Sequence, residues 1–125
     1  MVPPVPPNPA VRAACLRLGA TLPARLDGES RRRTVPASPL TTAWGDPAVV
    51  LRCGVARPAG YNAAAETAVV DGVAWFQQVG SASVTWTLVG RGAYLDLRVP
   101  TRYPAQAGFL VGLAGPITAA LPATG

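Results

Sequence analysis

The stretch Val69-Val70-Asp71-Gly72-Val73-Ala74-Trp75 decides the fold class of this 125-residue chain. Two short apolar runs flank Asp71-Gly72, a dipeptide that is the strongest short-range signal for a β-hairpin. Both turn residues of such a hairpin need a positive φ, which Asp and Gly tolerate. The stretch therefore predicts two antiparallel strands joined by a tight turn.

A second hairpin is predicted immediately downstream, over residues 83–99. Residues 83–89 and 94–99 alternate side chains between two faces, on either side of a turn at Gly90-Arg91-Gly92. Residues 48–54 alternate in the same way and form a further predicted strand. Because consecutive hairpins pair antiparallel, we expect one antiparallel sheet.

Helical patterns flank these strands on both sides. From Pro9 to about Leu22, apolar residues recur at helical spacing, with Asn8 suited to cap the helix and Pro23 to end it. Residues 104–121 predict a second helix, with a kink or break at Pro116. The stretch 104–125 carries no charge, but glycines and prolines interrupt it. A helix packed on the core is therefore favoured over a membrane span.

The order helix, strands, helix predicts an α+β fold. We expect a two-layer sandwich, in which an antiparallel sheet of about five strands carries the N- and C-terminal helices on one face. A single domain over residues 9–122 is expected, with a Pro-rich extended leader at 1–8 and a tail at 123–125.

Turn chemistry dominates residues 24–46, which we interpret as loop. The triplet Arg31-Arg32-Arg33 falls within this region. Three adjacent arginines cannot share one face of a strand, and no aromatic residues are interleaved with them, so a solvated loop is favoured over a phosphate-binding patch. We therefore expect no nucleic-acid partner; such binding would show a steep salt dependence.

The composition excludes several classes of chemistry. The chain has no His and no Lys, and its net charge of +5 comes from Arg alone. Without His, the common general base and the commonest metal ligand are missing, and without Lys there is no Schiff-base chemistry. Two Cys cannot complete a four-ligand zinc site. We expect no metal and no cofactor, and enzymatic activity is disfavoured.

Three segments together resemble a known family. They are residues 43–55 (AWGDPAVVLRCGV), residues 70–76 (VDGVAWF) and residues 90–100, with GRGAYL and a final VP. In this order they resemble domain-of-unknown-function family 3515, a group of exported or membrane-anchored actinobacterial proteins, over roughly residues 12–122. The resemblance implies an extracytoplasmic location and a signal or anchor segment upstream. It implies no activity and no catalytic residues.

The resemblance bears on the two cysteines. Cys15 lies on the apolar stripe of the first predicted helix and Cys53 on the apolar face of the strand at 48–54, so both face one layer if that helix packs on that strand. The extracytoplasmic location that the family implies favours a Cys15–Cys53 disulfide over two buried free thiols. Members of the family often carry another cysteine just before the Asp-Gly hairpin, where this chain has Glu66-Thr67-Ala68, so the family's pairing does not transfer directly.

The candidate binding site is the sheet face that the helices leave uncovered. Tyr94 with Thr87, or Asp96 with Thr85, are candidate cross-strand neighbours on it. A solvated face with surface pairs Asp96–Arg98 or Arg52–Asp96 is the alternative. The expected members are Arg52, Thr85, Thr87, Tyr94, Asp96 and Arg98.

Trp44, in the turn-rich segment before Asp46-Pro47, is a possible exposed aromatic, although a loop Trp can also close the edge of a core. The sequence thus favours a non-enzymatic, extracytoplasmic accessory or binding domain of the cell envelope. Its expected partner is an envelope protein, an anionic glycan or a lipid head group. The alternative is a small hydrolase or transferase that uses carboxylate and Tyr chemistry on an envelope component.

Overall fold

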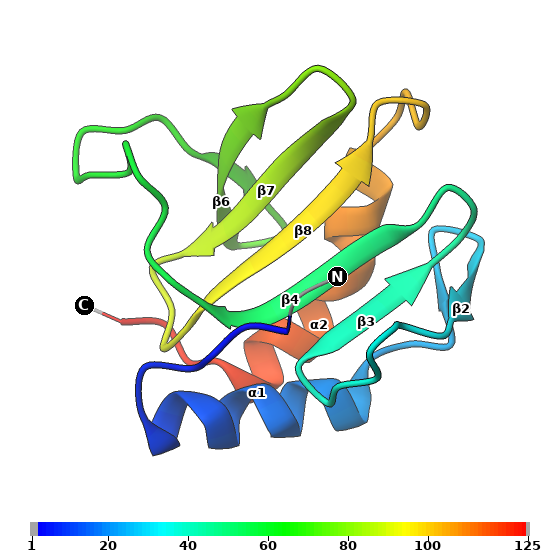
Figure 1. The fold of residues 1–125 in the computed structure, drawn as a ribbon. Helices are drawn as coiled ribbons and strands as arrows, with labels where there is room; N and C mark the ends of the chain where they lie inside the picture. Colours follow the sequence, from blue (N-terminus) through cyan, green and yellow to red (C-terminus); the bar gives the residue numbers. More distant parts are fainter. Residues whose placement is uncertain (1–2, 125) are drawn as a thin grey trace.

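The computed structural model describes residues 3–124 and shows an α+β fold with two helices and one antiparallel sheet (Figure 1). The helices are α1 (Pro9–Thr21) and α2 (Ala107–Ala120). The strands are β1 (Arg25–Leu26), β2 (Glu29–Arg32), β3 (Thr41–Trp44), β4 (Val49–Val55), β5 (Ala68–Val70), β6 (Val73–Val79), β7 (Ser83–Val89) and β8 (Tyr94–Pro100). Their spatial order is β1-β2-β3-β4-β8-β7-β6-β5.

The sheet has eight strands, so the expectation of about five is wrong. The additional strands β1, β2 and β3 all lie in residues 24–46, which were predicted to be loop. Asp27 and Gly28 have φ values of 49° and 83°, and they form the turn of the β1–β2 hairpin. The strands beside this turn are short and polar, so they lack the apolar alternation that marks the other strands.

The predicted hairpins at residues 69–75 and 83–99 are present. Asp71 and Gly72 have φ values of 51° and 79° in the turn between β5 and β6, and β7 pairs with β8 beyond the turn that follows Val89. Helix α1 begins after Asn8, whose side chain accepts a hydrogen bond from the Val11 N–H at 2.9 Å. Helix α2 continues through Pro116 to Ala120, so the predicted break does not occur.

The core lies between the sheet and the two helices. Alternation places one set of strand side chains toward the helices, where they are buried together with residues of α1 and α2. We call this the inner face of the sheet, and the opposite side the outer face. The main inner-face residues of the long strands are Val49, Leu51, Cys53, Val73, Trp75, Val84, Leu88, Leu95, Leu97 and Val99.

A disulfide joins Cys15 of α1 to Cys53 of β4, as expected (Cα–Cα 5.5 Å). Each residue is only 1% exposed. The bond therefore fixes the first helix on the inner face of the sheet, from inside the core.

Trp44 is completely buried, so it is not the exposed aromatic that was considered possible, and the alternative, a Trp that closes the edge of the core, holds. It is the last residue of β3 and lies opposite Val49, which puts its ring on the inner face. Its indole Nε1 donates a hydrogen bond to the Pro23 carbonyl at 3.0 Å. Trp44 precedes the turn instead of lying in it, and it connects the β3–β4 hairpin to the segment that follows α1.

Gly45 makes this turn tightly packed. Its φ is +78°, and a Cβ added there would lie 2.6 Å from the Tyr103 hydroxyl and 2.8 Å from Glu29 Oε1. The Tyr103 hydroxyl donates a hydrogen bond to the Pro47 carbonyl at 2.8 Å. The segment Trp44-Gly45-Asp46-Pro47 thus joins three parts of the fold: the end of α1, the β3–β4 hairpin and the loop after β8.

The described part of the leader packs on the sheet. Pro4 is buried, and Pro6 lies 3.0 Å from where a Cβ of Gly54 would stand. At the other end, the Thr124 N–H donates to the Gly90 carbonyl at 2.9 Å. Met1 and Val2 of the predicted leader and Gly125 of the predicted tail lie outside the described residues. Within residues 3–124, no helix is long and apolar enough to span a membrane.

Removing the disulfide should destabilise the fold strongly. The bond closes a loop with a sequence separation of 38, and the chain-entropy model gives about 4 kcal/mol for a loop of that size. In a urea titration, we expect the free energy of unfolding of the Cys15→Ala/Cys53→Ala protein to be lower than that of the wild type by this amount. Two reactive thiols in the unfolded, unreduced wild type would contradict the assignment.

Candidate functional site

The register of the central strands brings the candidate residues together on the outer face. Asp96 of β8 lies between Arg52 of β4 and Thr87 of β7, so these three side chains form one row across the sheet. Thr85 and Arg98 form the next row, since they pair directly with each other. Thr87 is therefore opposite Asp96 and Thr85 opposite Arg98, so both expected cross-strand pairs, Tyr94–Thr87 and Asp96–Thr85, are wrong.

Asp96 is the one carboxylate among the six residues of this cluster, and its pKa is shifted. The Thr87 Oγ1 donates a hydrogen bond to Asp96 Oδ1 at 2.8 Å. Burial raises the pKa of Asp96, while the bond from Thr87 and the positive charge of Arg52 act in the opposite direction and do not outweigh it. The outer face thus holds a half-buried carboxylate that is harder to ionise than an ordinary aspartate.

Arg52 lies beside Asp96 without a hydrogen bond to it. Its Nε is covered by protein and has no hydrogen-bond partner among residues 3–124. The only ion pair of the described part joins Arg32 to Asp46, so neither of the expected surface pairs, Asp96–Arg98 and Arg52–Asp96, forms. A covered donor without an acceptor is costly, and no group outside the protein reaches this atom while the fold stays as it is.

Arg98 and Thr85 form the exposed part of the cluster. Arg98 is exposed and its Nε donates to Ser83 Oγ at 3.1 Å, which leaves the outer nitrogens of its guanidinium free of any bond to the described residues. Thr85 is half-buried beside it. The second row therefore offers donors directly to solvent.

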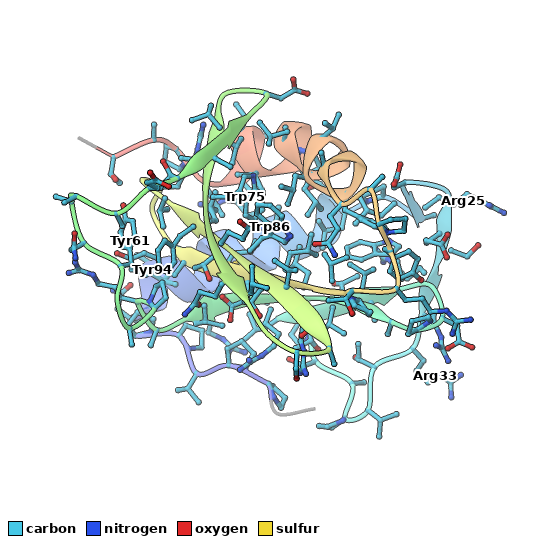
Figure 2. All side chains as sticks on the ribbon, turned by 90° about the horizontal axis from the view of Figure 1, so that it is seen from above. Arg25, Arg33, Tyr61, Trp75, Trp86 and Tyr94 are labelled. Carbon is cyan, nitrogen blue, oxygen red and sulfur yellow. A yellow bond between two sulfur atoms is a disulfide. The ribbon has the colours of Figure 1, made fainter. Side chains whose placement is uncertain are left out.

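Tyr94 belongs to an aromatic group at one end of the outer face (Figure 2). The Tyr61 ring packs edge-on against Phe76 at 5.4 Å and against Tyr94 at 6.5 Å between centroids. The Arg57 guanidinium lies 5.6 Å from the centre of the Tyr61 ring. Tyr61 and Arg57 could not be found from the sequence, because they come from a loop whose path no local pattern reveals.

A hollow of about 350 Å³ opens beside this aromatic group. Its wall includes Tyr61, Tyr94 and Arg91, whose Nη1 is held by the Leu121 carbonyl at 3.0 Å. Pro7 of the leader and Thr124 near the other end of the chain also line it. The leader and the tail therefore help to shape the surface next to the cluster.

The outer face is more covered than an open sheet face would be. Thr41, Ala43, Thr87 and Val89 are buried on it, although the helices lie on the other side. The Thr41 hydroxyl contacts the Thr34 hydroxyl and the Ser38 carbonyl, both at 3.4 Å, so the segment before β3 covers part of the face. What stays accessible is the row of Arg98 and Thr85, where Arg98 is exposed and Thr85 half-buried.

The Arg31–Arg33 triplet lies partly in strand β2, so its assignment to a loop is wrong. Arg31 Nη2 donates to the Leu22 carbonyl at 3.0 Å, and Arg32 Nη1 donates to the Gly45 carbonyl at 3.0 Å. Figure 2 shows Arg33 at the end of the molecule away from Tyr61 and Tyr94. Two of the three guanidiniums thus hold the local fold, although all three residues are exposed.

The described residues contain no group of three or more His, Cys, Asp or Glu that could hold a metal ion.

The fold and the site define a class: a two-layer α+β domain whose first helix is disulfide-bonded to the sheet and whose outer face carries a polar cluster. The family model described as "Protein of unknown function (DUF3515)" matches residues 1–125, and the chain belongs to this family. No curated protein and no solved structure matches the chain.

Replacing Asp96 by Asn should raise the free energy of unfolding at neutral pH, because a neutral amide avoids ionisation of a half-buried carboxylate. The raised pKa means that the folded state binds more protons than the unfolded state, so wild-type stability falls as the pH rises through the folded pKa. The advantage of the variant should therefore disappear below the ordinary aspartate value of 3.8.

Urea unfolding across this pH range measures the difference between the two proteins. Asp71→Asn is the matched control, since it removes a carboxylate at an exposed turn position that Asn also suits. An Asp96→Asn protein whose free energy of unfolding is lower than that of the wild type, by the same amount at neutral and at low pH, would contradict the account.

Proposed function

We propose that this protein is a non-enzymatic binding domain of an actinobacterial cell envelope, located outside the cytoplasm. The outer-face cluster is the proposed contact surface, and its ligand is an anionic group of a glycan, a lipid head group or a partner protein. The anchor or signal segment that the family resemblance implies would hold the domain at the envelope.

The observation that carries this proposal is the pair of arginines on the outer face. Arg52 forms no ion pair with any described residue, and Arg98 presents the free outer nitrogens of its guanidinium one row away. Guanidinium groups recognise carboxylates and phosphates in a bidentate manner, and this recognition is stronger where water is partly excluded. An anionic ligand over β4 and β8 would pair with both arginines.

Two further features support the location and the role. A buried disulfide is typical of proteins that fold in an oxidising compartment. The cluster holds two arginines, of which Arg98 is exposed and Arg52 half-buried, and its one carboxylate is Asp96. Both features fit a domain that meets anionic envelope material.

The alternative is a small hydrolase or transferase, and the raised pKa of Asp96 is the observation that favours it. Such an enzyme needs a pocket in which polar groups converge on a substrate. The hollow beside the cluster is lined by Tyr94 but not by Asp96 or Arg52. Binding is therefore the better-supported function, and Asp96→Asn would abolish hydrolysis if the alternative held.

The charge-reversal pair Arg52→Glu/Arg98→Glu should weaken binding at least about tenfold, since it removes the donors and repels the anion. Two probes separate the sources: phosphatidylglycerol vesicles in a sedimentation assay, and a soluble polyuronate in calorimetry. The matched control is Arg12→Glu/Arg17→Glu, which makes the same charge change at exposed positions of α1.

The proposal predicts that the control pair keeps most of the binding, and that envelope pull-downs and cell-fraction profiles change only for the outer-face pair. Equal losses for both pairs would indicate a general effect of net charge. That result, or unchanged binding in the outer-face pair, would contradict the proposed surface.

A further inference from the structure

The two edges of the sheet differ in how they are protected. At one edge, β1 has only two residues and carries Arg25, which are common ways to keep an edge from pairing with another chain. At the other edge, β5 pairs with β6 only at Val70–Val73, Val69–Ala74 and Ala68–Trp75. The second half of β6, residues 76–79, extends beyond β5 and has no strand beside it among the described residues.

The register shows which backbone groups of β6 are free. The Gly80 N–H donates to the Ser83 carbonyl across the β6–β7 turn, so the even-numbered residues 76, 78 and 80 bond to β7. The N–H and C=O groups of Gln77 and Val79 therefore point away from β7, to the open edge. Neither of these two backbone N–H groups donates a hydrogen bond to any residue in 3–124.

Nothing in this segment discourages pairing. Residues 76–79 are Phe-Gln-Gln-Val, without a charge or a proline, and Val79 is 74% exposed. Natural edge strands are usually interrupted by such residues, because a free, flat edge is a template for another strand.

We infer that this edge pairs with the same edge of a second copy of the chain, antiparallel and around a two-fold axis at Gln78. In this arrangement Gln77 of one copy forms a hydrogen-bonded pair with Val79 of the other, and the reverse pair follows by symmetry. The free donors and acceptors of both residues are then satisfied. Gln78 faces the partner's Gln78 on the outer side of the joined sheets.

The shape of the edge favours a second copy as the occupant. Gln77 and Val79 point to the inner face, where a hollow of about 390 Å³ is lined by Gln77, Trp86 and Pro104, among others. The partner's Val79, placed opposite Gln77, would cover part of this hollow with an apolar side chain. The exposed Val79 of one copy would thus pack over the hollow beside the half-buried Trp86 of the other.

The end of β5 leaves room for the partner's turn. Past the Gln77–Val79 pair, the next residue of the partner is Gly80, which arrives opposite Phe76 and carries no side chain. A hollow of about 430 Å³ lies at this point, between residues 65–68 and the pair Phe76 and Gln77. The rest of the turn is Ser81-Ala82-Ser83, which is small enough to pass the start of β5.

Sedimentation velocity over a concentration series tests this inference on the full chain. We expect a monomer–dimer equilibrium with a dissociation constant on the order of 100 µM, because the interface is small. Val79→Lys should weaken it at least about tenfold, since a lysine at an edge opposes pairing. The matched control Val111→Lys changes an exposed valine of α2 and should leave it unchanged.

A cysteine at the two-fold axis gives an independent readout. Cα atoms of a non-hydrogen-bonded antiparallel pair are about 4.5 Å apart, which a disulfide can bridge. Gln78→Cys should therefore form a disulfide-linked dimer on mild oxidation, whereas Val111→Cys should not. The native cysteines are bonded and buried and do not interfere.

A chain that stays monomeric up to about 1 mM would overturn the inference. A dimer that Val79→Lys does not weaken, or a Gln78→Cys protein that cross-links no faster than Val111→Cys, would overturn it as well. None of these results depends on the ligand of the outer face, because neither Val79 nor Gln78 is one of the six residues of the outer-face cluster.

Discussion

The contact between α1 and β4, closed by the Cys15–Cys53 disulfide, is the constraint on which the rest of the structure depends. It fixes the odd-numbered residues Val49 to Cys53 as the inner side of β4. Through the register with β8 and β7, the same choice turns Leu95, Leu97 and Leu88 inward and Asp96, Arg98 and Thr87 outward. A slip by one residue would exchange the two faces. The same alternation of side chains therefore places the core on the inner face and the candidate site on the outer face.

Much of the architecture could be predicted from local patterns, because the long strands and the helices have clear periodicities. The Asp71-Gly72 turn, the two hairpins and the cap at Asn8 all follow from residues close together in the sequence. The strands β1 to β3 could not be found in this way, because they are only two to four residues long and lie among turn residues. The place of Trp44 in the core goes with its position in β3 and with its hydrogen bond to Pro23, which lies twenty-one residues away in the sequence.

The candidate site, like the fold, could be predicted from the sequence only in part. Which residues share the outer face follows from period-two alternation, so the cluster could be assembled from the sequence. The pairing of Thr87 with Asp96 could not be predicted, because it depends on the number of residues in the turn after Val89. The unpaired Nε of Arg52 and the approach of Tyr61 to Tyr94 depend on tertiary packing, which no local pattern reveals. The most informative features of the site are therefore the ones that needed the structure.

The central claim is that the outer face, and not the arginine triplet of β2, is where this domain meets an anionic ligand. Amide chemical shifts of the ¹⁵N-labelled chain, followed during a titration with phosphatidylglycerol bicelles and then with the soluble polyuronate, test it most directly. The account predicts that the largest changes occur at Arg52, Asp96 and Arg98, with smaller ones at Tyr94. Changes concentrated at Arg31 to Arg33, with the outer face unaffected, would contradict it.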